Sequence, residues 1–215
     1  MKRLAIFDLD GTLLNTIDDL AVAVNHALEV NHFPTHSIPS YRMMVGNGVR
    51  RLIERALPTD ERSDALIDRL LLDFRQYYDA HLHDFTTPYP GIPQLLAELD
   101  SRGVALAVAS NKYESAVVRL IANFFGQHQF VGVCGNVEDI PTKPDPSIVF
   151  RILSQYPTPK ADIIYVGDSA VDMETARRAG VTAVGVTWGF RPERELTAAF
   201  ADHIISDPAD LLPLL

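Results

Sequence analysis

The hydrophobic positions of the chain form short apolar runs, and helical patterns separate these runs. The runs lie at residues 4–7, 104–109, 130–134, 163–166 and 182–186. None of them alternates with polar residues, which is typical of strands buried on both faces of a parallel sheet. Helical periodicity occupies residues 92–102, 113–125, 147–156 and 171–179, and residues 204–205 could add an edge strand. This alternation predicts an α/β fold with a doubly wound, mostly parallel sheet.

Residues 16–84 follow a different pattern. They contain almost no strand-like run and read as helices interrupted near Pro34, Pro39, Gly46-Asn47-Gly48 and Pro58. One of these helices carries apolar residues at helical spacing, which we expect to form the core of this part: Leu66, Leu70, Phe74 and Tyr77. We therefore predict a catalytic core of residues 1–15 and 85–215, with an inserted helical cap of residues 16–84. Hinges are expected near residues 15–16 and 86–88, and closure of the cap would exclude water from the site.

Composition and charge narrow the function classes. Hydrophobic residues make up 47% of the 215 residues, charged residues make up 22%, and the formal net charge is −9. This balance provides for a sizeable core and disfavours nucleic acid or anionic membrane as a partner. One cysteine, Cys134, excludes an intrachain disulfide, and the first apolar stretch ends at Asp8, too early for a signal peptide. The expectation is a cytoplasmic protein, a monomer or weak dimer.

Polar residues follow the predicted strands, where functional groups of parallel α/β sheets gather. Asp8 and Asp10 follow the first strand, and Ser110-Asn111-Lys112 follows the second. Lys143 precedes a later helix, while Asp168 and Asp172 follow the fourth strand. These positions would place carboxylates, a hydroxyl and ammonium groups at one edge of the sheet.

This set of groups matches what phosphoryl transfer from a monoester requires. A carboxylate can act as nucleophile, and a second carboxyl group can protonate the leaving oxygen. A hard cation such as Mg²⁺ prefers oxygen ligands, and a serine and a lysine can hold phosphate oxygens. Taken singly, Asp168 and Ser110 could be helix N-caps, and Lys143 could be a surface lysine. Their joint placement after separate strands favours the functional interpretation.

These motifs resemble those of the haloacid dehalogenase superfamily, within it the phosphoglycolate phosphatase-like group with a helical cap. The resemblance rests on Asp8-Leu9-Asp10-Gly11-Thr12, Ser110, Lys143 in Lys-Pro-Asp-Pro, and Gly167-Asp168 with Asp172 four residues later. It implies that Asp8 is the nucleophile that becomes an aspartyl-phosphate, and that Asp10 is the general acid and base. It also implies that Ser110 and Lys143 bind the phosphoryl group. Mg²⁺ would be held by Asp8, the Asp10 carbonyl and Asp168, with Asp172 nearby through water.

Alternatives within and beyond this family can be weighed against the same residues. Members that cleave carbon–halogen bonds lack the second aspartate, so Asp10 favours a phosphate substrate. Phosphonate-cleaving members carry a cap lysine, and residues 15–84 contain none. A phosphosugar mutase, another phosphometabolite or pyrophosphate as substrate, and a non-enzymatic binding module remain alternatives. The favoured substrate is a small phosphorylated metabolite, 2-phosphoglycolate.

The cap is expected to set specificity. The loop with Gly46, Asn47 and Gly48 leads into a helix, where backbone N–H groups and Arg50 or Arg51 could receive a substrate carboxylate. The opposite interpretation, in which the arginines are solvated and the glycines only cap the helix, is open as well. We also expect Asn111, beside Ser110, to contact substrate.

Overall fold

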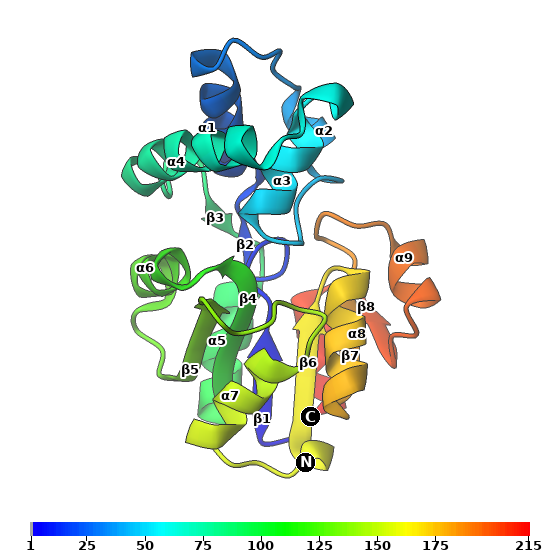
Figure 1. The fold of residues 1–215 in the computed structure, drawn as a ribbon. Coiled ribbons are helices and arrows are strands. Elements are labelled where there is room, and N and C mark those ends of the chain that lie inside the picture. The colour runs from blue at the N-terminus through cyan, green and yellow to red at the C-terminus, as the bar shows by residue number, and fades with distance from the viewer. Residues whose placement is uncertain (1) are drawn as a thin grey trace.

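The centre of the computed structural model, which describes residues 2–215, is a six-stranded parallel sheet in the order β5-β4-β1-β6-β7-β8 (Figure 1). Its strands are β1 (Leu4–Phe7), β4 (Ala105–Tyr113), β5 (Phe130–Asn136), β6 (Ile163–Gly167), β7 (Thr182–Val186) and β8 (His203–Ile205). β1 lies in the middle, where Leu4 is paired with Ala105 on one side and Ile163 on the other. The predicted α/β fold and its edge strand are confirmed.

Helices cover both faces of this sheet. They are α5 (Ile92–Ser101), α6 (Glu114–Phe125), α7 (Ser147–Gln155), α8 (Ala170–Ala179) and α9 (Glu193–Ala198), with 3₁₀ turns at Lys160–Asp162 and Pro208–Leu214. Ala5 and Phe7 pack with α5 and α6, whereas Leu4 and Ile6 pack with α7 and α8. Successive strand residues thus enter two separate apolar layers, which explains why the strands read as unbroken apolar runs.

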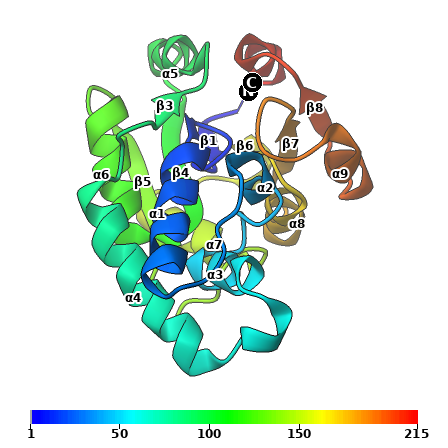
Figure 2. The same cartoon turned by 90° about the horizontal axis from the view of Figure 1, so that it is seen from above.

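Four helices lie over the carboxyl ends of the central strands (Figures 1 and 2). They are α1 (Ile17–Val30), α2 (Ile38–Tyr41), α3 (Val49–Ala56) and α4 (Asp64–Ala80), with a 3₁₀ turn at Thr59–Glu61. We call them the cap helices. Two short antiparallel strands, β2 (Leu14–Asn15) and β3 (Thr87–Pro88), connect them to the sheet, at the segments expected to act as hinges.

The buried face of α4 differs by one position from the predicted one. Leu70 and Phe74 are buried as expected, but Tyr78 is buried in place of Tyr77, and Ile67 in place of Leu66. The Tyr77 ring instead stacks on the rings of His26 and His81, at 4.3 Å in each case. In the part of the chain that the structure describes, no helix has both the length and the apolar character of a bilayer span.

A buried carboxylate fastens the cap helices to the returning chain. Asp19, in the first turn of α1, is 3% exposed. Its oxygens accept hydrogen bonds from the N–H groups of Phe85 (3.0 Å) and Thr86 (2.8 Å) and from the Thr86 hydroxyl (2.6 Å). The two connections between sheet and cap helices therefore meet at one side chain.

Replacement of Asp19 should destabilise the protein strongly. Asp19→Ala leaves buried donors without an acceptor, and hydrogen bonds to charged groups contribute about 1.5–3 kcal/mol each. We expect the free energy of unfolding in urea to fall by about 2–3 kcal/mol. Asp18→Ala, in the same helical turn, is the control and should change it by less than about 0.5 kcal/mol. Equal effects of the two substitutions would contradict this role of Asp19.

Candidate active site

A cluster of three carboxylates and one ammonium lies at the carboxyl ends of β1 and β6. Asp8 follows β1, Asp168 follows β6, and Asp172 lies in the first turn of α8. One carboxylate oxygen from each aspartate lies within 4.8 Å of the others. Lys143 reaches the cluster from the loop before α7, and its side chain is 2% exposed. The sequence predicted this meeting of residues from three separate segments.

Lys143 ties the cluster together. Its Nζ lies 2.9 Å from Asp8 Oδ1 and 2.7 Å from Asp172 Oδ1, and it donates to the Ala109 carbonyl at 2.9 Å. These three oxygens match the three N–H donors of an ammonium group. A buried ion requires such compensation, since removing a charge from water is costly.

Both carboxylate oxygens of Asp172 already have partners within the protein. Oδ1 faces Lys143, and Oδ2 accepts hydrogen bonds from the Ser169 hydroxyl (2.6 Å) and the Ser169 N–H (3.1 Å) at the start of α8. Its side chain is fully buried. Asp172 therefore positions Lys143, and it stands beside the other two carboxylates with its own lone pairs in use.

Burial and mutual repulsion perturb the ionisable groups of this cluster. Burial, together with the nearby Asp172 and Asp10 charges, outweighs the attraction of Lys143 and raises the pKa of Asp8 to about 7. Burial raises the pKa of Asp168 well above its usual value, and the charges of Asp172 and Asp8 add to this. Burial alone would lower the pKa of Lys143, but Asp172 and Asp8 together raise it above its ordinary value.

This donor set fits a divalent cation. Three ionised carboxylates and one ammonium leave two negative charges uncompensated, and all candidate ligand atoms are oxygens, which hard cations prefer. Glycines let the backbone approach Asp168 closely: a Cβ on Gly11 would lie 2.3 Å from Asp168 Oδ2, and one on Gly189 would lie 2.4 Å from it. The Phe190 N–H donates to the same oxygen at 2.6 Å and orients it.

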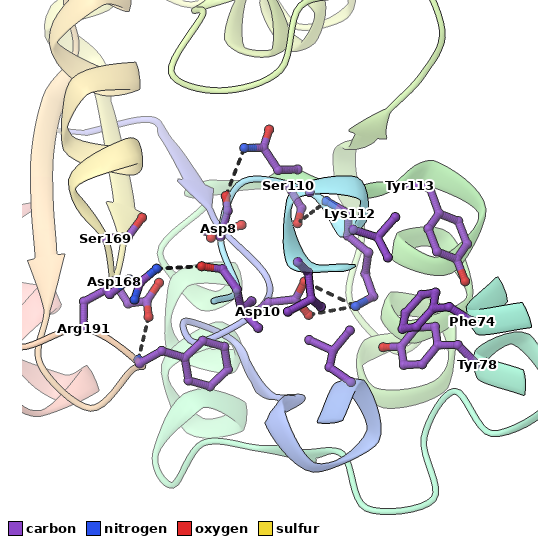
Figure 3. Close-up of a pocket in the computed structure, with 18 residues that line it drawn as sticks. Asp8, Asp10, Phe74, Tyr78, Ser110, Lys112, Tyr113, Asp168, Ser169 and Arg191 are labelled. Atoms are coloured by element: carbon purple, nitrogen blue, oxygen red, sulfur yellow. Dashed lines mark hydrogen bonds and ion pairs between the residues drawn. The ribbon is translucent and has the colours of Figure 1, made fainter. Parts of the chain in front are cut away.

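Asp10 belongs to a second charged pair. Its carboxylate lies 3.1 and 3.3 Å from Lys112 Nζ, and Oδ1 also accepts a hydrogen bond of 2.7 Å from the Thr16 hydroxyl (Figure 3). Ser110 precedes Lys112 by two residues, and its Oγ accepts a hydrogen bond of 3.2 Å from the backbone N–H of Lys112. Within residues 2–215 the Ser110 hydroxyl makes no other hydrogen bond, so its hydrogen can be donated to a bound oxygen.

The charged groups open into a cavity of about 50 Å³ between the sheet and the cap helices (Figure 3). Asp8, Asp10, Ser110 and Asp168 line the sheet side. The opposite wall is mostly apolar and is made by Leu20, Val45, Val49, Leu52 and Phe74, with the backbone of Gly46 and Gly48. A polar end and an apolar end of this kind are typical of small-molecule sites.

The structure corrects the placement of two predicted cap residues. The Arg50 guanidinium pairs with Asp64 and Asp68 on the exposed side of α4 and does not line the cavity. The Asn47 side chain also turns away, since its Oδ1 accepts a 2.7 Å hydrogen bond from Arg55. Gly46 does line the cavity, through its backbone. Arg50 points outward because its acidic partners lie on α4. The sequence of the loop alone does not reveal these partners.

Asn111 lines the cavity but its amide is already used. Its Oδ1 accepts the Lys143 N–H (2.8 Å), and its Nδ2 donates to the Lys143 carbonyl and the Gly46 carbonyl (3.1 Å each). Both N–H hydrogens are thereby engaged. This side chain, which we expect to contact substrate, also braces the loop that carries Lys143 against the loop before α3 (residues 42–48, the cap loop).

Among the cavity residues to which the sequence assigned no role are Lys112, Tyr78 and Arg191. The feature of the sequence that could have identified Lys112 as a cavity residue is its position two residues after Ser110. Tyr78 follows Phe74 by one helical turn, so the same face of α4 carries both. Arg191 donates to the carbonyls of Arg42 (2.9 Å) and Val45 (2.6 Å), and so holds the loop before α3.

Carboxylates that could hold a cation and a buried lysine converge at one edge of the doubly wound sheet, an arrangement suited to a phosphatase. Residues 5–186 match the family of haloacid dehalogenase-like hydrolases, and the chain belongs to this family. It is therefore a phosphoric monoester hydrolase, and the recognised motifs are confirmed as those of this family.

Full-length relatives carry a common name. A phosphoglycolate phosphatase of Pseudomonas syringae pv. tomato is 35% identical over 99% of this chain and 79% of its own. One of Mannheimia succiniciproducens is 33% identical over 99% of this chain and 98% of its own. A crystal structure from Lactobacillus delbrueckii subsp. bulgaricus, provisionally assigned as a phosphoglycolate phosphatase, superimposes with a TM-score of 0.91 at 31% identity and covers 98% of this chain and 97% of that one.

The close approach of Gly11 to Asp168 should be essential for cation binding. Gly11→Ala would force a methyl group against Asp168 and should abolish both the Mg²⁺-induced rise in Tm and the hydrolysis of p-nitrophenyl phosphate. Gly103→Ala is a matched control, because Gly103 also has a positive φ (69° against 86°) but has no atom within 4 Å of the added Cβ. The control should show only backbone strain of about 1 kcal/mol. Loss of Mg²⁺ binding in both variants would contradict the steric explanation.

Cation affinity should depend on pH through Asp8. Above a pH of about 7 the carboxyl is ionised, and below it a proton must leave before a cation binds. The Mg²⁺ affinity, measured by isothermal titration calorimetry, should therefore be nearly flat from pH 8 to 7.5. It should then weaken by up to about tenfold per pH unit toward pH 6 for each proton displaced. An affinity that is unchanged between pH 8 and 6 would show that protons do not compete at this cluster.

Proposed function

We propose that this phosphatase is a Mg²⁺-dependent enzyme that hydrolyses 2-phosphoglycolate to glycolate and phosphate. The observation that carries the proposal is the lining of the cavity, in which the carboxylate cluster and Ser110 face a mostly apolar wall. The mostly apolar wall offers few hydrogen-bond partners for the hydroxyl groups of a sugar ring, so it suits a smaller leaving group better. The phosphoglycolate phosphatases that match this chain over nearly its whole length support the same choice.

Asp8 is proposed as the nucleophile. Lys143 and the Leu9 N–H both contact its Oδ1, at 2.9 and 2.7 Å, and so fix the orientation of the carboxylate. Attack of Asp8 on phosphorus forms an aspartyl-phosphate while the bond from phosphorus to the glycolate oxygen breaks. The free hydroxyl hydrogen of Ser110 is available to the phosphoryl oxygens, and Lys143 places its positive charge beside the transferred group, where the donor that faces Asp8 can pass to a phosphoryl oxygen as Asp8 attacks.

Asp10 is proposed to move the proton in both halves of the reaction. Its carboxyl group gives a proton to the leaving glycolate oxygen in the first step. In the second step it takes a proton from the water that attacks the aspartyl-phosphate, which releases phosphate and regenerates Asp8. The hydrogen bond from Thr16 and the contact with Lys112 hold Asp10 in place between these steps.

Mg²⁺ is proposed to bind Asp8, Asp168 and the backbone carbonyl of Asp10. Bound there, it would offset the negative charge of the phosphoryl group and of the buried carboxylates. We further propose that residues 16–84 act as a cap over the catalytic core of residues 1–15 and 85–215. The short strands β2 and β3, which pair where the chain leaves the sheet and returns to it, support this division. The Gly46 and Val45 carbonyls accept hydrogen bonds from Asn111 and Arg191 of the core.

Release of inorganic phosphate from a panel of substrates tests the proposal. The panel contains 2-phosphoglycolate, 3-phosphoglycerate, glucose 6-phosphate, glucose 1-phosphate and pyrophosphate, each with Mg²⁺ and with EDTA. We expect kcat/KM for 2-phosphoglycolate to exceed the others by about 100-fold or more, a discrimination that a satisfied ionic contact can supply. EDTA should remove the activity.

The nucleophile is tested in the same assay. Asp8→Asn should lower kcat by at least about 10³-fold, as the loss of a nucleophile does in other enzymes. Asp60→Asn, at an exposed position on the cap, is the control and should match the wild-type rate. Flat, Mg²⁺-dependent activity across the panel would refute the substrate while the Asp8 chemistry stands. Activity retained in Asp8→Asn would refute the mechanism.

A further inference from the structure

Lys112 and Tyr78 lie next to each other where the sheet side of the cavity meets its mostly apolar wall. Lys112, at the end of β4, has a side chain that is 4% exposed, and its Nζ lies 4.8 Å from the centre of the Tyr78 ring. Tyr78, on α4, is fully buried. Figure 3 shows the Lys112 ammonium between Asp10 and the Tyr78 ring. The two side chains thus meet across the boundary between sheet and cap helices.

The Tyr78 hydroxyl has no hydrogen-bond partner within residues 2–215. A buried hydroxyl without a partner is unusual, because it loses its hydrogen bonds to water on folding. Tyr78 lines the cavity, so a molecule bound there can supply the missing acceptor. The phosphatase chemistry at Asp8 and Asp10 leaves this hydroxyl unused.

Besides Lys112, the positively charged side chains near the cap loop are arginines that already bind other groups of the protein. Arg191 lines the cavity, but its guanidinium donates to the Arg42 and Val45 carbonyls. Arg50 pairs with carboxylates at the surface. Lys112 has three N–H donors, and Asp10 is its one hydrogen-bonding side-chain partner within the described residues. It therefore has donors left for a second anion.

We propose that Lys112 and Tyr78 form the subsite that binds the carboxylate of the substrate's leaving group. This inference rests on the proposed function and deepens it, since it names the residues that select a phosphorylated carboxylic acid. An ammonium and a phenolic O–H both donate, so the pair complements an anion. The apolar neighbours Leu20, Val49 and Leu52 accommodate the methylene group and strengthen the ionic contact by excluding water.

The placement of Lys112 also explains how both ends of a small substrate are held at once. Ser110 and Lys112 lie on the same strand, two residues apart, and both line the cavity. Ser110 faces the phosphoryl group, and Lys112 receives the carboxylate a few atoms away. One rigid strand end thereby sets the distance between the two anionic groups that the enzyme accepts.

The test compares 2-phosphoglycolate with ethyl phosphate, which has the same carbon chain without the carboxylate. Lys112→Met removes the charge, and Tyr78→Phe removes a single oxygen atom. We expect Lys112→Met to raise KM for 2-phosphoglycolate by about 10- to 100-fold and Tyr78→Phe by about 3- to 10-fold. KM for ethyl phosphate should change less than about threefold in both variants. Because Lys112 also contacts Asp10, a fall in kcat shared by the two substrates is expected as well.

Two controls separate binding from folding. Lys160→Met, a lysine outside the cavity, should leave the kinetics of both substrates unchanged. Tyr78→Phe should keep or raise Tm, because it removes a buried hydroxyl that has no partner. A purely structural role for Tyr78 would show no change in selectivity between the substrates.

The outcomes distinguish this inference from the proposed function. A wild-type enzyme that prefers 2-phosphoglycolate, with the preference lost in Lys112→Met, supports both. If the preference persists in Lys112→Met, or if KM rises equally for both substrates, the subsite is refuted and the function stands. A wild-type enzyme without a preference for the carboxylate refutes the substrate and the subsite together.

Discussion

The buried ammonium of Lys143 is the interaction on which the site depends. Three carboxylates cannot be buried side by side unless their charge is offset, and Lys143 places a positive charge among them. It offsets one charge and leaves the two that a divalent cation can neutralise. The protein alone therefore leaves the charge balance incomplete. Burial, with the nearby Asp172 and Asp10 charges, raises the pKa of Asp8, and a bound cation would favour the ionised form of this carboxyl group.

The fold accommodates this cluster by bringing backbone and carboxylates unusually close together. A Cβ on Gly167 would lie 2.3 Å from the Cβ of Asp172, and a Cβ on Gly189 would lie 2.3 Å from that of Asp168. Glycine at the end of β6 thus lets the first turn of α8 approach the strand. Asp172 serves this turn and Lys143 at once, so the start of α8 and the position of the lysine depend on the same side chain. The stability of the fold and the arrangement of the charged site therefore both depend on Asp172.

The sheet and the charged residues at its edge could be predicted from the sequence, because both follow from local patterns. Apolar runs identify strands buried on two faces, and residues that follow parallel strands meet at one edge whatever the details of packing. The cap side depends on tertiary partners instead. Arg50 is drawn outward by Asp64 and Asp68, which lie on another helix, and a one-position shift on α4 buries Tyr78 in place of Tyr77. The sequence shows Lys112 two residues after Ser110, but the role proposed for it depends on its pairing with Asp10 and its contact with Tyr78, which only the structure reveals.

The two sides of the cavity are mechanically joined by Asn111. A single amide holds both backbone groups of Lys143 and the carbonyl of Gly46, so the loop that carries the buried ammonium and the loop that covers the cavity share one support. Arg191 adds a second connection, from the segment whose Phe190 N–H orients Asp168 to the carbonyl of Val45. Each segment that contacts the cap loop thereby also fixes one charged group of the cluster. The position of the cap helices and the alignment of the phosphoryl-binding groups are consequently parts of the same hydrogen-bond network.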